Sequence, residues 1–371
     1  MNNNTIQPSV LNSSLKCNGC GALLLFVPGS GNLKCDHCGV SNPIATDHNA
    51  STIKSFDYEL FVDRIDQNKK SDDLKMVKCS SCGSETVLSA FTTSDRCSFC
   101  TAPLVLSTQN GQQYVPPHYV LPFEISKDQA VYFFQNWLNK LWWTPSDLIK
   151  QVNSSTSSIQ GVYLPHWSFD TTTTSAYTGN RGDYYYTTEN YTVTTENGKT
   201  ENRTRQVRHT RWTTVTGEVE NIFNDLIVPA SKSLPTKTLK ELSPWNFDLL
   251  VKFDERYMSG FRSETYQVTP EQGFSLASDQ TKDRIRFTIQ SKIGGDEQQI
   301  SGFYTDFHKK AIKYIMLPVW VSAYVYNKKI YQFTVNASTG EVIGERPLSW
   351  TKIILFVFMV LILLCLVTLL V

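Results

Sequence analysis

The segment Cys17–Cys38 reads CNGCGALLLFVPGSGNLKCDHC, which is a C-x2-C-x14-C-x2-C pattern. Each C-x2-C turn offers two sulfurs to one metal ion, and the apolar hairpin between the turns brings the second pair back to the first. We therefore predict a zinc ribbon over residues 14–42, with Cys17, Cys20, Cys35 and Cys38 as the metal ligands.

The same pattern recurs 62 residues further along the chain, at Cys79, Cys82, Cys97 and Cys100. This predicts a second ribbon over 76–104, separated from the first by a polar linker at 43–75. Four thiolates complete a tetrahedral shell and leave no position for substrate, so the two Zn²⁺ ions are expected to be structural. Iron in a rubredoxin-like site remains an alternative metal. Disulfides are disfavoured because residues 1–16 lack the apolar core of a signal peptide.

At the other end of the sequence, Ile353–Val371 contains nineteen residues without a charge. At 1.5 Å per residue such a helix reaches about 28 Å, close to the hydrocarbon thickness of a bilayer. Trp350 and Lys352 precede it, as interfacial anchors do. The prediction is a single-pass, tail-anchored protein of the cell membrane.

Residues 309–352 carry seven basic and two acidic side chains. The positive-inside rule then places the N-terminal bulk in the cytoplasm, where thiolates also stay reduced.

The remaining soluble part, 105–349, is predicted to be one mixed domain, so the fold class is α+β and rich in antiparallel strands. Ser126 and Thr269 begin capping boxes for helices at about 127–143 and 270–293. Strands are expected at 161–169 and 313–326, which share a Leu-Pro-x-Trp core, and Asn197-Gly198 predicts a hairpin turn. Trp142 and Trp143 are expected in the core; the alternative is that they are exposed and form a docking surface.

Composition excludes several classes of protein. With 371 residues, 41% hydrophobic, 19% charged and a net charge of +1, the chain is neither disordered, nor fibrous, nor an obvious polyanion binder. Within it, Lys199–Arg211 has five basic residues and one acidic residue, interleaved with Val207, His209 and Trp212, and such a pattern on an extended strand can hold single-stranded nucleic acid. The alternative is a solvated hairpin whose charges prevent edge pairing.

No catalytic motif is found. The sequence lacks the G-x4-G-K-[ST] phosphate loop, H-E-x-x-H and G-x-S-x-G. His166, with Asp170 four residues later, is the single pair that suggests a hydrolase, and a core histidine is the simpler interpretation. We therefore predict no catalytic residue and no cofactor other than zinc.

The order of the paired ribbons, the helix QAVYFFQNWLNKLWWTPSDL, then GVYLPHWSFD, LPVWVSAYVY and VNASTGEVIGERPLSW resembles a bacterial family of zinc-ribbon membrane proteins. Its members often carry the label of primosomal replication-restart helicase-like proteins or of zinc-ribbon proteins of unknown function. The helicase label implies ATP-driven unwinding, which a chain without a phosphate loop does not support. From the resemblance, only the eight cysteines are carried over as functional residues.

These observations favour a non-enzymatic scaffold or adaptor that binds a protein partner at the cytoplasmic membrane face. The alternative is a nucleic-acid-binding protein without an ATPase motor. Neither the partner nor the oligomeric state follows from the sequence.

Overall fold

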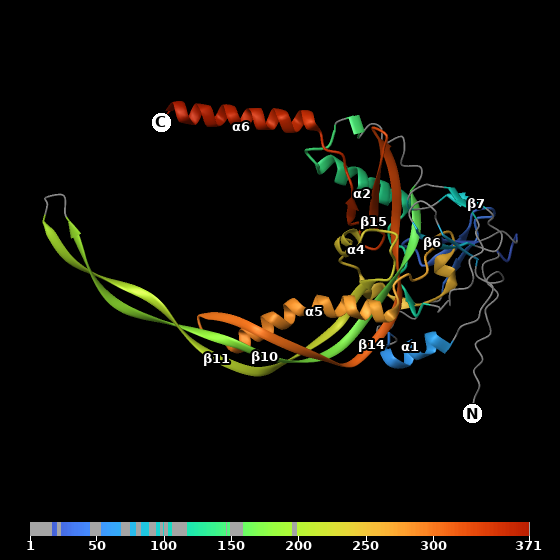
Figure 1. Ribbon diagram of the computed structural model, residues 1–371. Coiled ribbons are helices and arrows are strands. Elements are labelled where there is room, and N and C mark those ends of the chain that lie inside the picture. Colours follow the sequence, from blue (N-terminus) through green and yellow to red (C-terminus); the bar gives the residue numbers. More distant parts are fainter. Residues whose placement is uncertain are drawn as a thin grey trace.

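The computed structural model describes residues 17–20, 24–44, 53–67, 75–78, 83–88, 94–96, 99, 103–105, 117–145, 147–148, 159–194 and 199–370. Figure 1 shows a body of strands and helices from which two long elements project on the same side. One is a β-hairpin and the other is the C-terminal helix. The mixed α+β class, with large antiparallel sheets and one apolar C-terminal helix, is confirmed.

The main sheet has the order β11-β10-β14-β15-β16. Its long strands are β10 (Gln160–Thr194), β11 (Thr200–Pro229) and β14 (Glu297–Tyr326), followed by β15 (Lys329–Asn336) and β16 (Val342–Gly344). All four pairings along this path are antiparallel. Short strands at its margin are β4 (Phe56–Asp57), β9 (Tyr119–Val120), β12 (Val251–Lys252) and β13 (Arg262–Ser263).

The two Leu-Pro-x-Trp segments are strands, as predicted, and they lie side by side in antiparallel register. Leu164 of β10 is directly opposite Leu317 of β14. Proline has no N–H group to donate to a neighbouring strand. The proline of each segment lies where the strand on its other side ends. The β11 ladder ends at the residue after Pro165, and the β15 ladder ends at the residue after Pro318.

Beyond the body, β10 and β11 continue as an arm formed by Thr171–Thr194 and Thr200–Phe223 (Figure 1). The strand β14 accompanies the arm only as far as Gly182, which pairs with Glu297. Past that point the arm is two-stranded, and we call residues 183–194 and 200–211 the distal hairpin. Thr194 pairs with Thr200, so the predicted hairpin is confirmed, while the Asn197-Gly198 turn lies outside the described residues.

Both predicted helices carry the capping boxes expected from the sequence. In α2 (Lys127–Lys140) the Ser126 hydroxyl accepts from the Gln129 amide, and in α5 (Pro270–Ile293) Thr269 and Gln272 do the same. Helix α5 lies along one face of the proximal arm (Figure 1). Its apolar side, with Ile285 and Ile289, packs on Tyr177 and Val219 in a separate cluster. The arm is therefore stiffened at its base.

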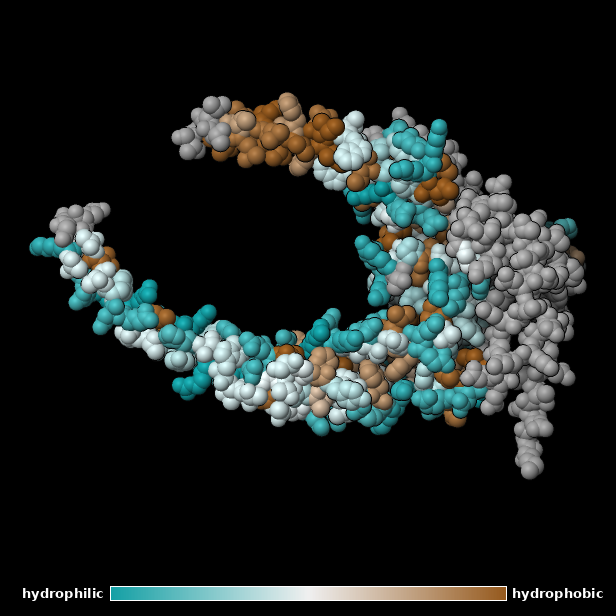
Figure 2. Space-filling view, in the orientation of Figure 1, coloured by the Kyte–Doolittle hydropathy of each residue, from teal (hydrophilic) through white to brown (hydrophobic). Residues whose placement is uncertain are grey.

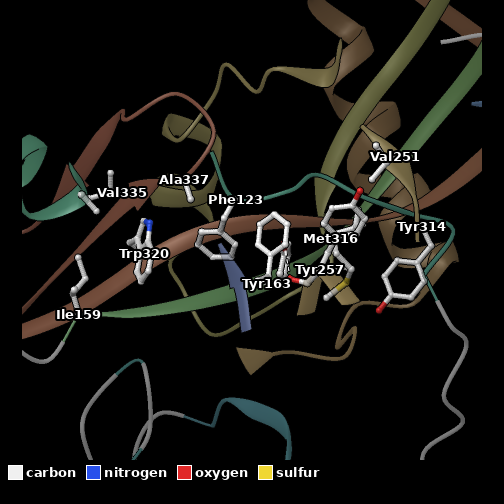
Figure 3. Close-up of a cluster of buried hydrophobic side chains, with 14 of the residues drawn as sticks. Phe123, Ile159, Tyr163, Val251, Tyr257, Tyr314, Met316, Trp320, Val335 and Ala337 are labelled. Carbon is white, nitrogen blue, oxygen red and sulfur yellow. Dashed lines mark hydrogen bonds between the residues drawn. The ribbon is translucent and has the colours of Figure 1, made fainter. Parts of the chain in front are cut away.

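The core of the body is dominated by aromatic side chains from distant segments (Figure 3). Phe123 stacks on Phe261 at 3.9 Å between ring centroids and meets Tyr163 and Trp320 edge-on. A second cluster lies around Leu121, Leu164 and Leu317. The remaining described helices are α1 (Tyr58–Gln67), α4 (Thr236–Glu241) and the 3-10 turns η3 (Phe247–Leu249) and η4 (Glu255–Met258).

The expectation for Trp142 is wrong. Helix α2 ends at Lys140, and the Trp142 side chain is 74% exposed. Trp143 is half-buried because its ring meets Phe356 of α6 (Trp350–Leu370), with ring centroids 5.2 Å apart. A contact between distant segments explains the exposure of Trp142. Lys352 donates to the carbonyls of Trp142 and Thr144, which turns this loop toward α6 instead of the core.

Among the described residues, α6 is the one helix that is long and apolar enough to cross a membrane, by length and composition. Its window Trp350–Val367 has a mean hydropathy of 2.8 and no buried residue. In Figure 2 most of the helix is brown, whereas the arm is mostly teal and white.

Candidate metal centre

The first four predicted ligands converge. The sulfurs of Cys17 and Cys38 are 3.4 Å apart, those of Cys20 and Cys35 are 3.5 Å apart, and all four lie within 4.8 Å of one another. A tetrahedral ion with metal–sulfur bonds of about 2.3 Å requires sulfur separations of about 3.8 Å. The cluster fits such an ion with small adjustments, so it can hold a metal.

A small antiparallel sheet positions the thiols. Strand β1 (Leu24–Val27) pairs with β2 (Asn32–Cys35), and β3 (Ser41–Pro43) continues the sheet. In this register Leu24 lies opposite Cys35, so the hairpin brings the two halves of the cysteine pattern together. After the second pair, Gly39 has φ +77°, and its amide donates to the Cys35 carbonyl at 2.8 Å. A glycine adopts this left-handed turn without strain.

Backbone amides favour the thiolate form at two of the four positions. The amides of Gly19 and Cys20 lower the pKa of Cys17 to about 7, and the amide of Cys38 lowers that of Cys35. The thiolate is the form that binds metal. At Cys38 the Val40 amide also lowers the pKa, but hydrogen bonds with the neighbouring thiols raise it more, to about 12, so the turns favour the thiolate at Cys17 and Cys35 and not at every ligand.

The ribbon packs on the body. The Phe26 ring meets Tyr257 edge-on at 5.2 Å between centroids, and the Phe26 amide donates to the Ser259 carbonyl at 3.1 Å. On the other side of the turn, the Gly29 amide donates to the Phe123 carbonyl at 2.9 Å. The buried cysteines, Cys17 and Cys35, belong to the same cluster as the core of the body. A metal held here would fix a surface of the body as well as a hairpin.

Cys79, Cys82, Cys97 and Cys100 lie outside the described residues, so the second ribbon stays a prediction. Strands β5 (Lys75–Lys78) and β6 (Glu85–Leu88) form one antiparallel pair, and β7 (Ser94–Arg96) and β8 (Pro103–Val105) form another; in the sequence, each pair flanks two of these cysteines. His37 lies in the turn between Cys35 and Cys38, where the four thiols already provide a complete set of ligands.

The structure does not bring His166 and Asp170 together as a catalytic pair. The His166 ring is buried, and its Nδ1 lies 3.1 Å from the Leu164 carbonyl. Burial lowers the pKa of His166 to about 4. It lines a small pocket of about 220 Å³ that also includes Leu239, Lys240 and Trp245. No acidic side chain is among the lining residues of this pocket.

Asp170 instead belongs to an ion cluster that the sequence analysis missed. The Lys313 ammonium lies 3.2 Å from Asp170 and 2.6 Å from Asp225, and the Asp225 amide donates to Asp170 at 2.7 Å. The hydroxyls of Ser55 and Ser168 complete the cluster. These residues come from β10, β11, β14 and the segment before β4. No local sequence pattern indicates such a meeting of distant segments.

The basic stretch of β11 is largely paired in the structure. Arg205 forms an ion pair with Glu189 across the strands at 3.1 Å, and Arg203 forms one with Glu201 at 3.3 Å. Arg208 lies over the Tyr184 ring, 4.3 Å from its centroid. Over residues 183–211 as a whole the sequence has five basic and four acidic side chains, a net charge of +1. The positive field of this segment is thus smaller than β11 alone suggests.

The fold and the site together define a protein with a four-cysteine cluster, a mixed body with a long β-arm, and one apolar terminal helix. The chain is 27% identical over 242 residues to "Uncharacterized protein YdjG" of Bacillus subtilis (strain 168). The match covers 65% of this chain and 66% of that protein, just under two thirds of its length. No family model and no solved structure matches the chain. The name of the relative carries no primosomal or helicase label.

Proposed function

We propose that the chain is a non-enzymatic scaffold held at the cytoplasmic face of the cell membrane by α6, and that its arm binds a protein partner. The two cysteine clusters each hold a structural Zn²⁺, and the first fastens a hairpin to the body. The arm is the observation that carries this proposal. Strand β10 has 35 residues, about 115 Å at 3.3 Å per residue, and its distal part contributes little to the core of the body.

The chemistry of the distal hairpin suits a protein surface. Its exposed tyrosines include Tyr185, Tyr186 and Tyr191. Tyrosine is enriched at protein interfaces because it combines a large apolar ring with a hydroxyl group. The distal hairpin has nearly equal numbers of basic and acidic side chains. Such a surface favours a specific protein partner over general attraction to a polyanion.

The test is site-specific photo-crosslinking of the full chain in membranes. Benzoylphenylalanine replaces Tyr186 in the arm or, as a control, Tyr132 on α2; both tyrosines are 60% exposed. We expect a discrete adduct of Tyr186 with another polypeptide, distinct in mass from a covalent dimer of this chain, that persists after nuclease treatment, and no equivalent adduct at Tyr132. Equal labelling at both positions would contradict a partner-binding arm.

The rival function is nucleic-acid binding, for which the arginines of β11 give the specific reason. Affinity for nucleic acid falls steeply with salt in proportion to the phosphates neutralised. We expect the zinc-loaded chain to bind single-stranded DNA, duplex DNA and RNA weakly, with a shallow salt dependence. Tight binding that is lost when Arg203, Arg205, Arg208 and Arg211 are changed to Gln would favour the rival.

A further inference from the structure

The two edges of the distal hairpin differ sharply in charge. Of the twelve residues Asp183–Thr194 on β10, two are charged, and four are tyrosines. Of the twelve residues Thr200–Arg211 on β11, five are charged, and four of these are arginines. Charged side chains are a common device against edge-to-edge pairing, and tyrosine and threonine favour strands. The β11 edge is protected in this way and the β10 edge is not.

The β10 edge becomes free where β14 begins. The Asp296 amide donates to the Gly182 carbonyl at 2.8 Å, and the Asp296 carboxylate accepts from the Tyr184 amide at 2.6 Å. Asp296 therefore caps this edge at its last point of contact with β14. Because backbone groups alternate in direction along a strand, the amides of Tyr186, Thr188, Asn190 and Thr192 point the same way as that of Tyr184. They face away from β11, and no strand of the described chain pairs with them.

An isolated two-stranded hairpin is marginally stable in water. The distal hairpin extends for twelve cross-strand pairs, from Asp183↔Arg211 to Thr194↔Thr200, without a third strand. A strand added along the β10 edge would satisfy its outward amides and carbonyls and give the tyrosines neighbours on the same face.

We propose that the β10 edge pairs with the same edge of a second copy of this chain. The two distal hairpins then form a four-stranded antiparallel sheet with the order β11-β10-β10-β11, in which a two-fold axis passes beside Thr188. The edges that remain outside are the charged β11 edges, so the pairing closes at two copies and does not propagate.

Charge disfavours two of the alternative registers. Centred on Thr188, the pairing sets Tyr185 opposite Tyr191 of the second copy and leaves Glu189 opposite the neutral Thr187. Shifting the centre to Glu189 would place two glutamates opposite each other, and shifting it to Tyr186 would place Asp183 opposite Glu189. Like charges directly opposite are destabilising. If α6 tethers both copies to one membrane, their effective concentration rises and a short edge suffices for pairing.

Proline substitutions at matched positions test the proposal. Thr188 and Gln206 are cross-strand partners, and both amides point outward, Thr188 to the β10 edge and Gln206 to the β11 edge. A proline at either position removes one outward N–H and no bond within the hairpin. Sedimentation of the full chain in detergent should show a dimer for the natural sequence and for Gln206→Pro. Thr188→Pro removes both hydrogen bonds of the central pair and should weaken the dimer by roughly thirtyfold or more.

A cross-linking experiment covers the case in which proline disturbs the hairpin itself. Thr188→Cys and Gln206→Cys are compared in a Cys365→Ser background with the zinc-loaded chain. In the paired sheet the two copies of residue 188 lie about 5 Å apart, and those of residue 206 lie three strand spacings or about 14 Å apart. A bismaleimide shorter than the second distance should join only Thr188→Cys. A monomeric natural chain, or cross-linking through Gln206→Cys instead, would overturn the proposal.

Discussion

The Lys313 ammonium nitrogen lies 2.6 Å from a carboxylate oxygen of Asp225, at the place where the arm leaves the body. Both ladders of β10 change register here, between Phe169 and Thr171 toward β11 and between Asp170 and Thr172 toward β14. Bulges bend a strand and increase its twist. The ion cluster joins all three strands at this bend, so it fixes the direction in which the arm departs.

Replacing Lys313 by Met should therefore destabilise the protein. Methionine keeps the length of the apolar stem but leaves the Asp170 and Asp225 carboxylates together without a cation. We expect a loss of about 2 kcal/mol in the free energy of unfolding, which allows for the partial exposure of Asp225. Chemical denaturation followed by tryptophan fluorescence measures this change. The exposed Lys329→Met serves as the control and should stay within about 0.5 kcal/mol of the natural chain.

The same cluster predicts a pH dependence. Burial raises the pKa of Asp170, but the Asp225 amide, the Ser55 hydroxyl and Lys313 together lower it more, so the net shift is downward. A carboxyl group whose folded pKa is lowered stabilises the fold above its unfolded pKa, about 3.9, and loses that contribution as the pH falls through the folded value.

The stability difference between the natural chain and Asp170→Asn should thus be constant from pH 5 to 8, and it should shrink below about pH 4. Loss of metal in acid destabilises both proteins equally, so it does not affect the difference between their free energies of unfolding at a given pH. A difference that grows on acidification would show that Asp170 does not act as a stabilised carboxylate.

The cysteine cluster makes a prediction about metal content. The natural chain should contain two zinc ions, and Cys35→Ser should contain one, because three thiolates hold zinc much less well than four. Elemental analysis gives the stoichiometry. Hydrogen exchange should quicken at the Phe26 amide, which bonds to Ser259, since the hairpin loses its fastening to the body. Cys365→Ser should change neither measurement.

Local sequence signals predicted the parts of the structure that form within a few residues. The capping boxes at Ser126 and Thr269 depend on contacts three residues apart, and both helices begin where expected. The spacing of Cys17, Cys20, Cys35 and Cys38 likewise predicted a hairpin of fifteen residues or so that gathers four sulfurs. In these cases all of the interacting residues lie within one short segment of the sequence.

The parts that were missed depend on contacts across long stretches of chain. Strand β10 gains a second neighbour as far as Gly182 because β14, more than a hundred residues later in the sequence, pairs with it. The same pairing brings Lys313 to Asp170, and the bond from Lys352 to the carbonyl of Trp142 keeps that tryptophan outside the core. Residue type and periodicity carry no information on which distant segment will be adjacent.

Gly273 allows α5 to approach β10 closely. A methyl group there would lie 2.6 Å from Cδ1 of Trp167, whose indole is fully buried and donates to the Val268 carbonyl. Gly273→Ala should cost about 1–3 kcal/mol through overpacking, in spite of the better helix propensity of alanine. Gly302 on β14 has no atom within 4 Å of the equivalent position, so Gly302→Ala should be neutral or slightly stabilising. Thermal unfolding of the two variants checks the contrast.

Insertion of α6 into a bilayer requires it to turn relative to the body. In Figure 1 the arm and α6 project on the same side, and the strands of the arm reach beyond the C-terminal end of the helix. The arm carries exposed ion pairs such as Arg205–Glu189, which hydrocarbon does not tolerate. A helix that spans the membrane in this orientation would place the arm at the depth of the lipid tails.

The contact between Trp143 and Phe356 should therefore break when the helix inserts. A bismaleimide that joins Trp143→Cys to Phe356→Cys, in a Cys365→Ser background, would hold α6 against the end of α2. We expect the cross-linked chain to be incorporated into liposomes far less than the untreated chain, as measured by flotation. The thiol form of the same protein is the matched control, since it differs only in the cross-link. Equal incorporation of both forms would show that α6 enters the membrane without leaving the body.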